Sequence, residues 1–209
     1  MKDWIERFEE LDGQLADWNE KHAAAADGLM RKRRGLLSFW KKPSADELAS
    51  VAQEAASQVG DGPHADVSAA IDELGRHFLE SGPQERAKIR AWIGASRSML
   101  GALWSYARAS ADVVHGDDAE ARLELGLTAL SIDDGRAEIA EVWQVLADLW
   151  VAAVRAEIDP RPVIERVAAV SNKGASGGAA HMRELLVDFE RSEHFEPLVG
   201  ERLGTRRTG

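Results

Sequence analysis

The chain of 209 residues contains no cysteine, a single tyrosine and no long uninterrupted apolar run. Without cysteine it has no disulfide, no thiolate nucleophile and no thiolate metal ligand. No stretch approaches the roughly 18 apolar residues that a membrane-spanning helix requires. The N-terminus is acidic and amphipathic and lacks the apolar segment of a secretory signal. These features together predict a cytoplasmic protein.

The composition is that of a folded, acidic protein. Hydrophobic residues make up 44% of the chain and charged residues 30%, with a formal net charge of −10. This balance is typical of a globular domain, and the length fits one domain with an N-terminal arm. A net negative charge argues against non-specific nucleic-acid binding, so no nucleic-acid partner is expected.

The sequence also lacks the motifs of common catalytic and metal sites. Its six histidines are scattered, and neither Glu-x-x-His nor His-Glu-x-x-His occurs. No Ser–His–acid set can be proposed from the spacing, the Asp-rich segment at 132–135 fails the calcium-loop spacing, and the glycine-rich segment 171–178 lacks the Gly-Lys-Ser/Thr order of a phosphate-binding loop. We therefore expect no catalytic residue, no cofactor and no metal, that is, a protein that is not an enzyme.

The first helix has the clearest pattern in the chain. Its aromatic and aliphatic residues follow a 4-3-4-3 spacing, which is the seam of a coiled coil or helical hairpin. The seam residues are Trp4, Phe8, Leu11, Leu15 and Trp18. We expect an amphipathic N-terminal helix within residues 1–28, from Asp3 to about Ala26, that stops near Gly28. Its seam is expected to pack either on the protein's own body or on a second copy of the chain.

A basic connector, residues 29–43, follows this helix. It concentrates six positive charges around two aromatic residues. The residues concerned are Arg31, Lys32, Arg33, Arg34, Phe39, Trp40, Lys41 and Lys42. One interpretation is a contact site for an anionic membrane or another polyanion. The other, which we favour, is a joint whose charges pair with the chain's own acids. A buried Trp40 would indicate the joint, and an exposed Trp40 the contact site.

The rest of the chain predicts a helical body, residues 44–196, and a flexible C-terminal tail, residues 197–209. Ser44 with Glu47 three residues later forms a capping box that begins the first body helix. Apolar stripes spaced by three and four residues alternate with Gly- and Pro-rich breakers. No strand-like alternation and no repeat stands out. The fold class is therefore all-α, with about eight helices in a globular bundle or a short irregular α-solenoid.

Two further expectations concern the core of this body. The stripe from Ile139 to Ala153 is apolar nearly all round, so this segment is expected to form the central core helix. A long helix is expected between Pro83 and His115. Six of the seven tryptophans fall on helical stripes and are expected in the core. They are Trp4, Trp18, Trp92, Trp104, Trp143 and Trp150.

The expected function is a non-enzymatic protein–protein interaction module, such as an adaptor, regulatory subunit or inhibitor. The expected partner is another protein or a second copy of the chain, bound through the N-terminal helix. A peripheral membrane or polyanion-binding protein acting through residues 29–42 is a second hypothesis and is less favoured. A helical sensor that binds a small ligand among the Trp-rich helices is a third.

Overall fold

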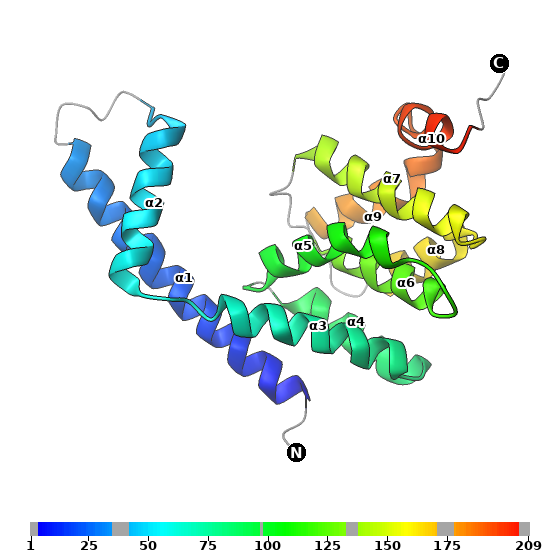
Figure 1. The fold of residues 1–209 in the computed structure, drawn as a ribbon, viewed down its shortest axis with the longest axis horizontal. Helices are drawn as coiled ribbons and strands as arrows, with labels where there is room; N and C mark the ends of the chain where they lie inside the picture. Colours follow the sequence, from blue (N-terminus) through cyan, green and yellow to red (C-terminus); the bar gives the residue numbers. More distant parts are fainter. Residues whose placement is uncertain (1–3, 35–41, 97, 133–137, 171–177, 205–209) are drawn as a thin grey trace. The chain divides into compact units, whose positions relative to one another are not determined.

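The computed structural model describes residues 4–34, 42–96, 98–132, 138–170 and 178–204. Within these ranges it contains ten α-helices, α1–α10, and no strand (Figure 1). The predicted all-α fold class is confirmed, although the helices number ten rather than about eight. Among the described residues, no helix combines the length and the apolar character needed to cross a bilayer.

The contacts along the chain divide it into two units. The first comprises Met1–Ala70 with Arg97–Met99, and the second comprises Ile71–Ser96 with Leu100–Gly209. The first unit therefore contains α1 (Trp4–Arg34), α2 (Ala45–Val59) and the beginning of α3 (His64–Glu80). The second contains the rest of α3 and all later helices. Each unit is described by itself below.

In the first unit, α1 and α2 form an antiparallel hairpin (Figure 1). Among the described residues, three buried side chains form the centre of their shared core: Leu29, Val51 and Ala55. Ala25, Ala26 and Met30 pack against it and are themselves half-buried. Because helix stability in proteins comes mainly from packing of the apolar face, this centre holds α1 and α2 together.

The predicted end of the first helix near Gly28 is wrong, because α1 continues to Arg34. A Cβ built on Gly28 meets nothing within 4 Å, so this glycine lies in an open part of the helix surface. A glycine inside a helix costs about 1 kcal/mol relative to alanine. Burial of the next residue, Leu29, against α2 offsets that cost. Residues 29–34 of the expected connector are therefore helical.

The beginning and end of α2 follow the local sequence closely. The Ser44 hydroxyl accepts a hydrogen bond from the Glu47 backbone N–H at 3.2 Å, as expected for an N-cap. Gly60 ends the helix at φ 87°, in the left-handed region that favours glycine. Its backbone N–H returns to the Ala56 carbonyl at 2.9 Å. The Gly-rich segment after Val59 thus stops the helix, as the sequence predicts.

The second unit contains the larger core. Its helices after α3 are α4 (Pro83–Ala95), α5 (Leu100–Ser110), α6 (Ala119–Leu130), α7 (Ile139–Arg155), α8 (Pro160–Val170), α9 (Gly178–Asp188) and α10 (Glu201–Leu203). The long helix expected between Pro83 and His115 is broken between α4 and α5. Helix α4 ends where Ser96 turns to extended backbone at ψ 127°, and the Ser96 side chain is buried.

The most completely buried helix is α6, whereas the stripe from Ile139 to Ala153 was expected to form the central core helix. Ten of its twelve residues are buried, against nine of the seventeen in α7. Gly126 lets α5 and α7 approach α6. A Cβ at Gly126 would lie 2.8 Å from Ser110 Cβ and 2.9 Å from Leu149 Cδ2. Helix α6 is thus the central element of this unit, in contact with α4, α5, α7 and α8.

Aromatic side chains hold the C-terminal segment against α7. Phe189 stacks on Trp143 with ring centroids 5.2 Å apart, and Phe195 meets Trp150 edge to face at 5.1 Å. A π-helical turn, Glu196–Gly200, follows, and its Val199 is fully buried in the same core. The predicted flexible tail from residue 197 is therefore wrong as far as residue 203, because this segment supplies apolar side chains to the core. Residues 205–209 lie outside the description.

Only two of the six tryptophans expected in the core are buried, namely Trp143 and Trp150. The other four are half-buried: Trp4, Trp18, Trp92 and Trp104. Partial exposure is common for tryptophan because the indole is large and carries a polar N–H. The helical spacing therefore identified the inward side of each helix correctly without fixing the depth of the side chain.

Candidate functional site

The α1–α2 hairpin carries most of the residues expected to act in binding. Three polar contacts set its register. The Trp18 indole N–H donates to the Gly60 carbonyl at 3.0 Å. The His22 ring lies 3.0 Å from the Ala52 carbonyl, and because a carbonyl only accepts, Nε2 is the donor. Toward the far end of α1, Arg33 donates to Glu54.

Trp18 is the centre of an aromatic cluster in the first unit. It stacks on His22 with centroids 4.9 Å apart and meets His64 edge to face at 4.5 Å. A Cβ at Gly62 would lie 2.8 Å from the Trp18 ring, so only glycine fits the loop at that point. Trp18 thus joins α1 to the end of α2 and the start of α3. It has a structural role that leaves little of the ring available to a partner.

The seam of α1 is largely used inside the chain. Phe8, Leu11 and Leu15 are 2%, 8% and 5% exposed, and Trp4 is half-buried with its ring edge on Phe8. Side chains this deeply buried are not available for binding without rearrangement. An interaction through α1 therefore has to use another face of the helix.

The basic segment is described only in part. Arg31, Lys32 and Arg33 are exposed on the last turn of α1, and Lys42 is exposed before α2. Arg33 pairs with Glu54 of α2 at 2.5 Å and with the Ser50 hydroxyl at 3.1 Å. This one residue behaves as expected for a joint whose charges pair with the chain's own acids. The Arg34 side chain and residues Phe39, Trp40 and Lys41 lie outside the description. The burial of Trp40 stays untested.

The outward face of α1 lies opposite the seam and follows a second 4-3-4-3-4 spacing. Every residue on it is exposed. We define this outward face as Glu9, Gly13, Ala16, Glu20, Ala23 and Asp27. A Cβ added at Gly13 meets nothing within 4 Å, which fits an uncovered surface. Its middle positions are mostly alanine and glycine, so the side chains at its centre are short. Charged residues lie at both of its ends.

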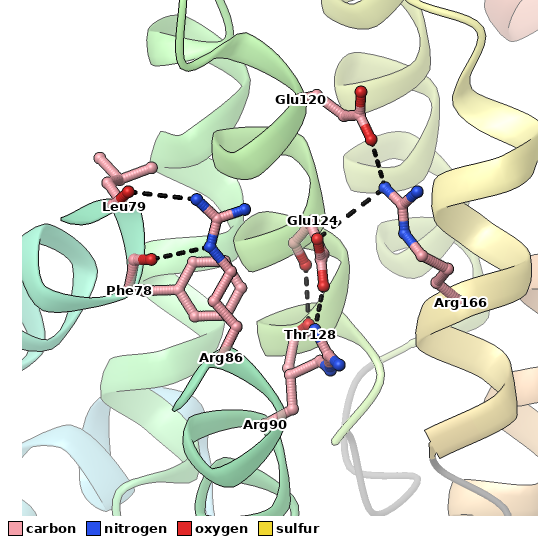
Figure 2. A network of polar contacts seen from close by, with 8 residues as sticks. All are labelled: Phe78, Leu79, Arg86, Arg90, Glu120, Glu124, Thr128 and Arg166. Carbon is pink, nitrogen blue, oxygen red and sulfur yellow. Dashed lines mark hydrogen bonds and ion pairs between the residues drawn. The ribbon is translucent and has the colours of Figure 1, made fainter. Parts of the chain in front are cut away.

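A second polar cluster lies inside the second unit (Figure 2). Glu124 on α6 is only 5% exposed, and its carboxylate pairs with Arg90 of α4. Arg166 of α8 lies 3.9 Å from the other carboxylate oxygen and also pairs with Glu120. A buried carboxylate is strongly destabilising unless it is paired and hydrogen-bonded. The Glu124 network therefore ties α4, α6 and α8 together.

Arg86 completes the polar cluster at the neighbouring helix end (Figure 2). Its Nε donates to the Phe78 carbonyl at 3.0 Å and its Nη2 donates to the Leu79 carbonyl at 3.1 Å. Both carbonyls belong to the last turn of α3, where helical partners are missing and the helix dipole favours a positive charge. The guanidinium also lies over the Phe78 ring, 5.3 Å from its centroid. This arginine caps α3.

The Glu124 network was not predicted from the sequence, although one signal was present. Leu123 and Leu127 lie on one side of α6 and Leu125 lies on the opposite side, so apolar residues occur on both sides of the helix. A charged residue in such a helix has to be buried and therefore needs a partner. Which arginine supplies the charge depends on long-range packing, which the local pattern does not contain.

Tyr106 on α5 has a shifted pKa. Burial raises the pKa of its phenol above the usual 10.0; nearby Arg122 lowers the pKa and Asp72 raises it. The phenol packs against Gly75 of α3, where an added Cβ would lie 2.6 Å from the hydroxyl. A phenol with a raised pKa stays neutral at physiological pH, so Tyr106 acts here as a packing residue.

Within the described ranges, no group of three or more His, Asp or Glu side chains is arranged to hold a metal ion. The charged side chains of the Glu124 network pair with one another, and Arg86 caps α3. Comparison of the chain with protein-family models, with curated proteins and with solved structures found no significant match.

Proposed function

We propose that the protein is a non-enzymatic interaction module that acts in the cytoplasm and binds a protein partner through its α1–α2 hairpin. The observation that carries this proposal is the uncovered outward face of a long helix. Helix α1 spans 31 residues, and its outward face is exposed along its length while most of its seam residues are buried. A partner that covers the outward face adds burial and stabilises the bound arm.

The small size of the residues at the centre of the outward face supports the same proposal, because it lets another helix approach closely. Leu48 on α2, 49% exposed, adds an apolar side chain to the accessible surface of the hairpin. Deeply buried seam residues such as Leu11 hold the helix in place and present its outward face to solvent.

The test uses surface substitutions in the full chain, because removing α1 would uncover residues that its seam buries. Ala16→Arg and Ala23→Arg place bulky charges on the outward face without touching the seam. Ala169→Arg, at an exposed position of α8, is the matched control. Proteins that co-purify with the chain from its native host are expected to be lost with the α1 variants and retained with the control. An unchanged set of co-purifying proteins would refute the proposal.

A further inference from the structure

Helix α1 carries opposite charges on its two halves. Residues 4–20 contain six acids and one arginine, whereas residues 21–34 contain five basic residues and one acid. Glu6, Glu9 and Glu20 are exposed in the first half, and Arg31 and Lys32 are exposed in the second. None of these five side chains has an ion-pair or hydrogen-bond partner among the described residues. The helix is therefore complementary to itself when two copies run in opposite directions.

The helix dipole accounts for only part of this separation. The dipole favours acids in the first turn and bases in the last turn, and its effect falls off beyond those turns. Glu6 and the four basic residues at 31–34 fit that rule. Glu9 and Glu20 lie further along the helix and gain nothing from it, and Asp17, at a similar depth, pairs with Lys21 at 2.6 Å. Like charges three or four residues apart on a helix also repel one another, which makes an acidic surface costly without a partner.

The geometry of an antiparallel pair matches the charges. With the two-fold axis beside Lys21 and His22, Glu9 lies about 19 Å from the axis along the helix, and residues 31–34 lie about 14–19 Å away on the other side. Glu6 and Glu9 then lie beside the basic end of the other copy, whereas Glu20 lies close to the axis. Near the axis, Ala16, Ala23 and Ala24 are small and exposed, so the two helices can approach closely.

Resting on the proposed function, we infer that the partner of α1 is a second copy of this chain, bound antiparallel through the outward face in a two-fold symmetric pair. Such a contact is isologous, since the same patch of each copy serves both sides. Arg33 remains on Glu54 of its own chain, so Arg31, which lies on the outward side of the last turn, supplies the basic charge at the contact, and Lys32 flanks it. Because these charges are solvent-exposed, the association depends on ionic strength.

The experiment measures the mass of the purified full-length chain by sedimentation in low and high salt, about 50 mM and about 500 mM. The wild type is expected to dimerise in low salt and to bind on the order of tenfold more weakly in high salt. The variants Glu6→Lys with Glu9→Lys, and Arg31→Glu with Lys32→Glu, are each expected to be monomeric. Glu138→Lys with Glu165→Lys, at exposed positions in the second unit, is the matched control and is expected to dimerise like the wild type.

Mixing the two α1 variants gives the decisive result. Each variant repels its own kind, but in the mixture the reversed acidic half of one faces the reversed basic end of the other. A heterodimer is expected from two chains that are monomeric alone, and misfolding cannot produce this outcome. A wild type that is monomeric in low salt, or a mixture that stays monomeric, overturns self-association. A monomer whose α1 substitutions still abolish binding to a different protein would leave the proposed function standing and reject only the second copy.

Discussion

The guanidinium of Arg90 on α4 pairs with the carboxylate of Glu124 on α6, and both side chains are largely withdrawn from water, 14% and 7% exposed. This pair crosses between two helices that are separated by a long stretch of sequence. Arg166 of α8 approaches the same carboxylate from another helix. Such a network contributes to stability mainly by excluding arrangements that would leave a charge buried and unpaired.

Replacing Glu124 by Gln is expected to destabilise the second unit by about 3 kcal/mol, because Arg90 is then left as a buried charge without a counter-ion. The free energy of unfolding in urea is the measurement. Glu120→Gln is the control, since its pair with Arg166 is exposed and worth about 0.5 kcal/mol. The double variant Arg90→Met with Glu124→Leu is expected to recover much of the loss. Equal effects of the two single glutamine substitutions would contradict this account.

Gly126→Ala is expected to lower the free energy of unfolding by about 1–3 kcal/mol. The new Cβ would overlap Ser110 and Leu149, and separating three packed helices is costly. Gly94→Ala provides the comparison, because a Cβ on that exposed helical residue meets nothing within 4 Å. It is expected to be neutral or to stabilise by up to about 1 kcal/mol. Thermal and urea unfolding of the two variants together distinguish crowding from helix propensity.

Tyr106 offers a spectroscopic test, since it is the only tyrosine in the chain. Burial raises the pKa of its phenol above 10.0, so its absorbance change in the folded protein is expected at higher pH than in the urea-unfolded protein. Because the folded pKa is the higher one, the unfolded chain loses its proton first as the pH rises. The stabilisation is fully present below about pH 10 and is lost as the pH passes through the folded pKa. Coincident titration curves for the folded and unfolded chains would show that the phenol is not buried.

Ser44→Ala is expected to weaken α2 by about 1 kcal/mol, since the Glu47 N–H loses its capping oxygen. Hydrogen exchange at the first amides of α2 should accelerate accordingly. Ser57→Ala is the matched control. The Ser57 hydroxyl bonds the Gln53 carbonyl inside the same helix, a contact that contributes little to helix stability. Exchange that is equally fast in both variants would argue against a specific capping effect.

Local patterns in the sequence predict local structure well in this protein. The Ser44 cap, the end of α2 at Gly60 and the inward side of α1 all follow from nearby residues. Features decided by distant contacts were not predictable in the same way. Packing of Leu29 on α2 carries α1 past Gly28, and burial of Val199 against α7 orders the segment expected to be a flexible tail.

Part of the candidate site could likewise be predicted from local patterns, and part depends on distant contacts. The 4-3-4-3 spacing identifies α1 as an amphipathic helix, but it does not reveal that Leu11 and Leu15 are already buried in the chain itself. Because these seam residues are buried, the proposed contact lies on the outward face, where Ala16 and Ala23 are exposed. Glu124 was missed because its importance lies in its arginine partners, which come from other helices.

The most direct test of the proposed interaction is site-specific photo-cross-linking in the native host. A photoreactive side chain at Ala16 on the outward face of the full-length chain is compared with one at Ala169 on α8, since both positions are exposed. The proposal predicts a discrete protein adduct from Ala16 and none from Ala169, and self-association predicts an adduct of twice the mass of the chain. The absence of an adduct at Ala16, or the same adduct at both positions, would contradict the central claim.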